Sequence, residues 1–202
     1  MASRTPWSKI APAGGAYRIS LKSGLTTVIN AAEPIFSCRW TSTTLKCFIQ
    51  KIKWNYMVAV AFGSAQLIDH GLYMARAFTA SDTGGTAATL TGNNCKLDTL
   101  FPSTAFAAGD IRISTTGLLT AGTRTLDTQP IITKAGWATV TAGTFVSDPS
   151  LEYLMGNQDA TNPITLRVNE GLVLAPLTTM GATGQVYVYF EMEWTEVPVN
   201  LA

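Results

Sequence analysis

The chain has 202 residues, of which 47% are hydrophobic and only 13% are charged. The charged share is about half of the roughly 25% usual in soluble domains, and a chain this apolar is not intrinsically disordered. The length suffices for one β domain with a sizeable core. A surface with so few charges is better suited to contact with other protein than to water alone.

The net charge of +1 is unevenly distributed along the chain. Up to Lys53 there are eight basic residues and one acid, Glu33, whereas the remainder holds six basic and 12 acidic residues. The two halves either neutralise each other within one fold or complement each other between neighbouring subunits. Because Lys and Arg form no run, we do not expect the protein to bind nucleic acid.

The three cysteines, Cys38, Cys47 and Cys95, are too few and too irregularly spaced for a disulfide framework. Cys38 and Cys47 could face each other across a hairpin, but buried free thiols are expected. Residues 1–15 lack the apolar core of a secretory signal, and no stretch approaches the roughly 20 apolar residues of a membrane span. We therefore expect a protein made in a cytoplasm that has no membrane partner.

Residues 1–16 are predicted to form an extended arm, because two prolines and a glycine pair disfavour helix. The arm either stays unattached or lies along a neighbouring protein, with Trp7 as its apolar anchor. Arg4 and Lys9 would suit an acidic surface on that neighbour. The sequence thus nominates Arg4, Trp7 and Lys9 as partner-binding residues.

Strand patterns follow the arm at residues 17–22, 26–29, 34–40, 46–62 and 66–79. In the fourth segment Phe48 shares one parity with Trp54 and Tyr56, so these side chains are expected on one face. A strand this long usually bends across two sheets or curls with a barrel. The fifth segment is apolar on both faces, and we expect it to pair with the fourth as its antiparallel neighbour.

Small polar residues dominate the middle of the chain. Residues 80–94 form an excursion that is too long for a turn and is typical of functional surface loops. Strands are predicted at 111–114 and around Phe145 and Val146, and a short helical turn is compatible with 150–154. The patterns assign no element to residues 95–106, 116–129 or 131–136.

The last third of the chain predicts a β-meander of three strands, at residues 164–168, 172–177 and 185–196. In the final strand the apolar positions from Val186 to Trp194 alternate with Tyr187, Tyr189 and two glutamates. The face that carries the residues from Val186 to Trp194 is therefore expected to point into the core. Solvent alone would not select aromatic residues on the other face, so Tyr187 and Tyr189 are further partner-binding candidates.

No residue pattern indicates catalysis, a cofactor or a metal. His70, the one histidine, lies between Ile68 and Leu72 in a strand, which favours a core or interface histidine with its hydrogen bonds satisfied. Glu191 and Glu193 share a strand face, and paired carboxylates can hydrolyse glycosides, but solvated alternate positions explain them equally well. Zinc-type and calcium-type spacings are absent. We predict no enzyme and no catalytic, cofactor-binding or metal-binding residues.

Short strands, long Gly/Thr-rich loops and almost no helical periodicity predict an all-β protein, an antiparallel β-sandwich or barrel. The predicted organisation is the arm, 1–16, followed by one β domain, 17–202.

Segments 76–94, 118–127, 169–174 and 186–196 resemble, in their Thr/Gly-rich and Glu-Trp-Thr-Glu style, virion structural proteins of tailed bacteriophages. The resemblance implies a jelly-roll-like sandwich that assembles on a capsid, often as a trimer, or sits in a tail. The expected function is a capsid decoration (cement) protein, located in the virion and assembled in the host cytoplasm. Its implied partners are itself, as a homotrimer, and the major capsid protein or other virion proteins. The alternative is a tail-associated receptor- or glycan-binding module.

Overall fold

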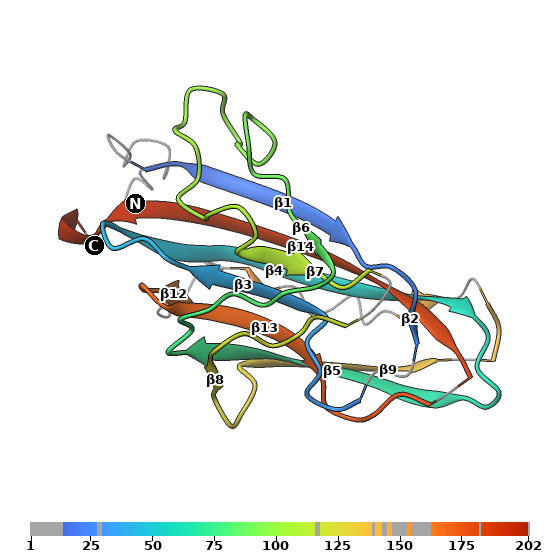
Figure 1. The fold of residues 1–202 in the computed structure, drawn as a ribbon. Coiled ribbons are helices and arrows are strands. Elements are labelled where there is room, and N and C mark those ends of the chain that lie inside the picture. Colours follow the sequence, from blue (N-terminus) through green and yellow to red (C-terminus); the bar gives the residue numbers. More distant parts are fainter. Residues whose placement is uncertain are drawn as a thin grey trace, which may run out of the picture.

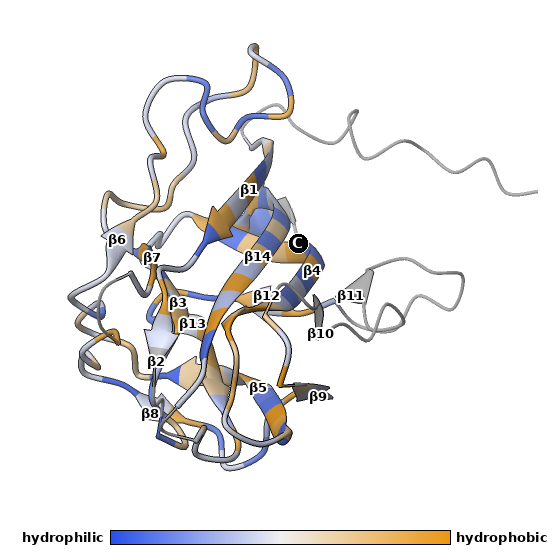
Figure 2. Cartoon of the chain, turned by 90° about the vertical axis from the view of Figure 1, so that its right-hand side faces the viewer, coloured by the Kyte–Doolittle hydropathy of each residue, from blue (hydrophilic) through white to orange (hydrophobic). Residues whose placement is uncertain are grey.

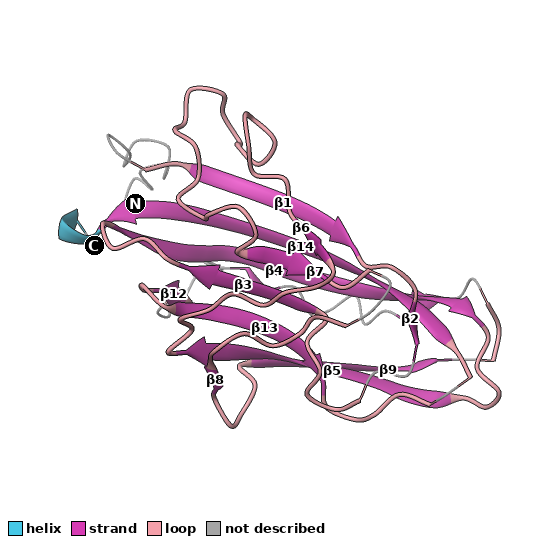
Figure 3. Ribbon diagram, in the orientation of Figure 1, coloured by secondary structure: helices cyan, strands magenta, loops and turns pink. Residues whose placement is uncertain are grey.

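Two antiparallel β-sheets lie face to face in the computed structural model (Figure 1). The structure describes residues 14–27, 30–115, 118–138, 140–142, 145–146, 153–154, 163–181 and 183–201. The expected all-β antiparallel sandwich is confirmed, and Figure 3 shows its strands joined by long loops. The one helical element among the described residues is the short 3-10 helix η2, Val199–Leu201.

Sheet A has the strand order β1-β14-β4-β10, with β11 and β12 also paired to β4 and β2 paired to β14. Its strands are β1 (Ala16–Lys22), β2 (Thr26–Thr27), β4 (Leu45–Val60), β10 (Phe145–Val146), β11 (Tyr153–Leu154), β12 (Thr165–Leu166) and β14 (Gln185–Pro198).

Sheet B has the order β6-β7-β3-β13-β5-β8, and β9 also pairs with β5. Its strands are β3 (Phe36–Trp40), β5 (Gln66–Arg76), β6 (Thr86–Ala87), β7 (Ile111–Ile113), β8 (Thr125–Leu126), β9 (Ile132–Ala138) and β13 (Glu170–Pro176).

The core lies between the two sheets. Along β14 buried and half-buried residues alternate from Gln185 to Glu196, as the period of two predicts, and Figure 2 shows this alternation as bands of opposite hydropathy. Trp40, Trp54 and Trp194 are fully buried. Phe36 of sheet B stacks on Phe190 of sheet A with ring centroids 3.7 Å apart. Burial of each such side chain stabilises the fold by about 2–3 kcal/mol relative to exposure.

A β-bulge in β4 overturns part of the predicted inward face. Glu193 pairs with Lys51 but Trp194 pairs with Ile49, so Gln50 is an extra residue in the ladder. Beyond the bulge the parity reverses, and Phe48 is half-buried whereas Ile49 is fully buried. The expected bend across two sheets is also wrong, because β4 remains in sheet A over all 16 residues.

The predicted strand neighbours are wrong in two places. β5 lies in sheet B and does not pair with β4, and the last three strands alternate between sheets A, B and A instead of forming a meander. β13 pairs with β3 and β5, while β14 pairs with β1 and β4. A period of two identifies which face of a strand is buried. It does not identify the neighbouring strand, because a place in either sheet would bury that face equally well.

Some of the smaller predictions are confirmed and others are wrong. Residues 132–138 form β9, where the sequence assigned nothing, and Tyr153–Leu154 is a strand instead of the end of a helical turn. Cys38, Cys47 and Cys95 are buried free thiols as expected, but Cys38 and Cys47 belong to opposite sheets and share no hairpin. Most of the predicted arm lies outside the described residues, and β1 begins at Ala16.

Candidate interaction surface

The one histidine lies inside the core. His70 is fully buried and stacks on Tyr56, with ring centroids 4.6 Å apart. Burial lowers the pKa of the imidazole to about 3, so the ring is neutral at physiological pH. A core position was expected, but satisfied hydrogen bonds were not found: neither ring nitrogen has a partner within the described part of the chain. The imidazole is out of reach of any substrate at the surface.

The paired glutamates form ion pairs with one arginine. Arg18 in β1 lies 3.1 Å from Glu191 and 3.4 Å from Glu193, and the two glutamates stand opposite Lys53 and Lys51 in β4. The basic first part of the chain and the acidic remainder therefore neutralise each other across β1, β14 and β4. Such partly exposed pairs contribute at most about 1 kcal/mol each.

The predicted aromatic pair lies on the outer face of sheet A. Tyr187 and Tyr189 are both half-buried, and the Lys22 ammonium lies 3.8 Å from the Tyr187 ring centroid and 5.8 Å from that of Tyr189. A cation over the rings occupies part of the surface that an intermolecular contact would use. The other nominated residues, Arg4, Trp7 and Lys9, lie outside the described residues.

Two further kinds of feature are absent from the described part of the chain. Within the described ranges no three His, Cys, Asp or Glu side chains are grouped so that they could hold a metal ion. No helix in that part of the chain has the length and apolar character needed to cross a membrane.

Much of the outer face of sheet B is covered by loops. Ala75, Phe78, Val173 and Ala175 form a second buried apolar cluster there, outside the main core. Arg39 fixes this cover, because its Nε donates to the Phe78 carbonyl at 2.6 Å. An ion pair between Arg124 and Asp82 and a cation–π contact from Arg124 to Phe78 hold the same loop.

The loops that cover the outer face of sheet B end near β9. Gly71 on the outward side of β5 has no room for a side chain, because a Cβ there would lie 2.8 Å from Pro130 and 3.1 Å from Leu177. These two residues thus pack directly on the sheet. Beyond them, towards the start of β5 and the end of β9, large apolar side chains are exposed.

We define the β9 surface by five residues that lie along β5, β9 and the end of β13: Leu67, Thr133, Ala135, Trp137 and Leu177. Trp137 is 69% exposed and stands directly opposite Leu67, which is 38% exposed. The Leu177 amide donates to the Asp69 carbonyl at 3.1 Å, which places Leu177 on the other side of β5. The Asp69 carboxylate between them accepts hydrogen bonds from the amide and hydroxyl of Thr178, both at 2.9 Å.

β9 is also an edge strand, because no described strand pairs with its second side. Its inward side is fixed by Lys134, whose ammonium is buried and donates to the Trp54 carbonyl of sheet A at 2.7 Å. An anchored strand that carries an exposed indole is a surface on which another protein can pack.

The sequence carries a signal for the β9 surface. Thr133, Ala135 and Trp137 share one parity, which is typical of an outward strand face. Small residues around the lysine and glycine of this segment weakened the strand pattern. Residue type alone does not separate an exposed tryptophan from a buried one.

The geometry defines the class of protein as an all-β antiparallel sandwich whose exposed apolar groups lie on an edge and on loops. No known family model matches the sequence, and no curated protein matches it. Among solved structures the chain is similar to the viral capsid protein VP1 of Merkel cell polyomavirus, as an unassembled pentamer. The identity is 9%, the alignment covers 90% of this chain and 95% of that chain, and the TM-score is 0.34.

Proposed function

We propose that the protein is a structural subunit of a bacteriophage virion: a capsid decoration (cement) protein that forms homotrimers and binds the head shell. The observation that carries this proposal is the exposed Trp137–Leu67 pair that β9 and β5 present on the outer face of sheet B. Specific protein interfaces are enriched in tryptophan and depleted of charge, and the β9 surface has this composition. The resemblance of the Thr/Gly-rich segments to phage virion proteins supports the location, and the role is structural, not catalytic.

Substitution of Trp137 tests the attachment. Trp137→Ser is expected to weaken binding to shells of the major capsid protein by about 30-fold or more, because a central aromatic anchor contributes at least about 2 kcal/mol. Co-sedimentation with purified empty heads measures the affinity. Leu25→Ser, which changes a different exposed apolar residue, is the matched control and should bind as the wild type does. Equal binding by Trp137→Ser and wild type would remove the β9 surface from the attachment.

A tail-associated glycan-binding module is the second candidate, favoured by the same exposed indole. Sugar rings stack on aromatic faces, and the Thr133 hydroxyl on the same strand face could hydrogen-bond to a sugar. Titration with host surface oligosaccharides would change tryptophan fluorescence in the wild type and not in Trp137→Phe. Shell binding without any glycan response favours the decoration role, and the reverse result favours the tail module.

A further inference from the structure

The loop formed by residues 97–101 presents an apolar side chain to solvent. Leu100 is 90% exposed, the most exposed large apolar residue of the described chain, and Leu97 is 56% exposed. Asp98 lies two positions before Leu100 and its carboxylate accepts a hydrogen bond from the Leu100 amide at 2.9 Å. We call this segment the Leu100 loop; it belongs to the connection between β6 and β7, which rises beyond β1 (Figure 1).

The Leu100 loop is held at both ends. The Leu97 amide donates to the Ala16 carbonyl at 3.0 Å, so the start of the loop is tied to β1. On the other side, the buried carboxylate of Glu196 accepts hydrogen bonds from the Thr104 hydroxyl and from the Ala105 amide. Exposure of the Leu100 side chain to water is unfavourable, and burial against a partner would remove that unfavourable free energy. A loop that is held at both ends also loses little conformational entropy when it binds.

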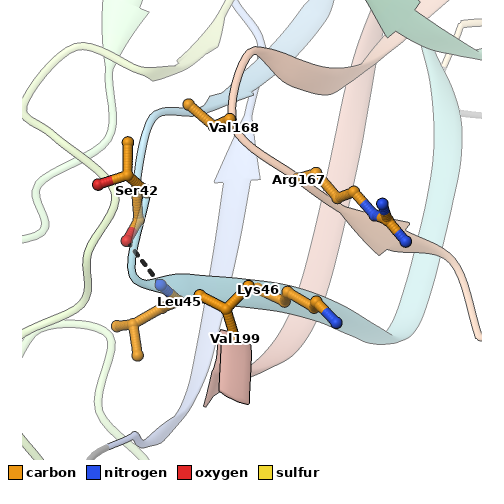
Figure 4. A pocket seen from close by; sticks show the side chains of 7 residues that line it. Ser42, Leu45, Lys46, Arg167, Val168 and Val199 are labelled. Carbon is orange, nitrogen blue, oxygen red and sulfur yellow. Dashed lines mark hydrogen bonds between the residues drawn. The ribbon is translucent and has the colours of Figure 1, made fainter. Parts of the chain in front are cut away.

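A pocket of about 160 Å³ lies at the same end of the sandwich, between the β3–β4 turn, the β12–β13 turn and η2. The Leu45 amide donates to the Ser42 hydroxyl at 3.1 Å, which shapes one wall. Figure 4 shows Lys46 and Arg167 extending to the same side of the opening. The residues that line the pocket include three apolar and three polar side chains, Leu45, Val168, Val199, Ser42, Lys46 and Arg167.

The pocket and the Leu100 loop are complementary in size and in charge. An apolar cavity of ~150 Å³ accommodates benzene, so a pocket of about 160 Å³ has room for the smaller isobutyl group of leucine. Two basic residues and no acid line the pocket. The loop supplies the opposite charge through Asp98, next to its exposed leucine.

We propose that the Leu100 loop of one subunit inserts into this pocket of a second copy, with Leu100 against Val168 and Val199 and Asp98 facing Arg167. This inference rests on the self-association that the proposed function includes. The loop leaves sheet A at the β1 edge, whereas the pocket lies beyond β14, at β4 and β12. The contact therefore joins two different surfaces, and such a heterologous contact closes a ring when repeated by rotation.

Two variants separate the halves of the contact. Leu100→Ser removes the inserted side chain but keeps the pocket, and Val168→Trp fills the pocket but keeps the loop. Each is expected to weaken self-association by about 30-fold or more in sedimentation velocity. A one-to-one mixture should form dimers, because only one of its two junction types is intact. Leu25→Ser is the control, and circular dichroism melting verifies that each variant is folded.

The outcomes distinguish this contact from the proposed function. Variants that retain the oligomer size of the wild type overturn the loop-in-pocket contact alone. Pocket variants that reduce shell binding without changing oligomer size also overturn it, since the pocket then receives the shell protein. A wild type that is strictly monomeric overturns both this contact and the self-association, whereas shell attachment is tested separately by Trp137→Ser.

Discussion

His70 combines complete burial with two unpartnered ring nitrogens, an arrangement that makes stability depend on pH. In the unfolded chain the imidazole binds a proton below its ordinary pKa of 6.5, but in the folded protein it stays neutral down to a pKa of about 3. The contribution of His70 is therefore fully present above pH 6.5 and is lost as the pH falls towards 3. Tyr56 stacks on the ring, and the charged group opposite His70 in β9 is Lys134.

His70→Phe is expected to reduce this acid sensitivity. Phenylalanine preserves the stacking on Tyr56 and removes both unsatisfied nitrogens, so stability at pH 7 should be equal or higher. Between pH 7 and 4 the wild type should lose on the order of 3 kcal/mol more than the variant. Urea unfolding at several pH values measures the difference. Parallel pH profiles for both proteins would show that His70 does not titrate as its burial predicts.

At the scale of the element, the bulge in β4 decides which side chains enter the core. Gln50 is the extra residue, and its presence turns Cys47 and Ile49 inward. If Gln50 were paired in the ladder like its neighbours, the alternation from Ile52 would direct Gln50, Phe48 and Lys46 into the core instead. The sequence alone predicts the uninterrupted alternation, because a bulge has no side-chain signature of its own in this strand.

Deletion of Gln50 tests that account. Without Gln50 the ladder runs unbroken from Lys51 opposite Glu193 to Ile49 opposite Trp194, and the alternation from Ile52 still directs Ile49 and Cys47 inward. We therefore expect a loss of no more than about 2 kcal/mol in the free energy of unfolding. Guanidinium unfolding measures the loss, and Gln50→Ala, which keeps the extra residue, should cost about 1 kcal/mol or less. A deletion variant that loses about 4 kcal/mol or more would mean that Gln50 does more than occupy the extra position in the ladder.

At the scale of the whole molecule, local sequence patterns predict where the strands lie better than they predict which strands pair. β1, β4 and β14 were found from alternation, yet the assignment of β5 and β13 to the opposite sheet depends on contacts between distant segments. The candidate interaction residues follow the same division. Tyr187 and Tyr189 were recognisable from one strand, whereas the exposure of Trp137 and Leu100 depends on where the covering loops end.

The N-terminal segment supplies the last prediction. The described residues of the main apolar core lie between Tyr17 and Trp194. We expect the sandwich to fold without residues 1–13. The segment carries Trp7 with Arg4 and Lys9, the composition of an anchor for an acidic surface. Deletion of residues 1–13 should leave the thermal transition within about 2 °C of the wild type and weaken shell binding by about 30-fold.

Differential scanning calorimetry and co-sedimentation with empty heads measure these two quantities, and Trp7→Ala in the full chain separates the anchor from the rest of the segment. If the truncated protein melts much earlier, the segment belongs to the folded core. If it binds shells as tightly as the full chain, attachment resides in the sandwich, and the β9 surface alone must supply it.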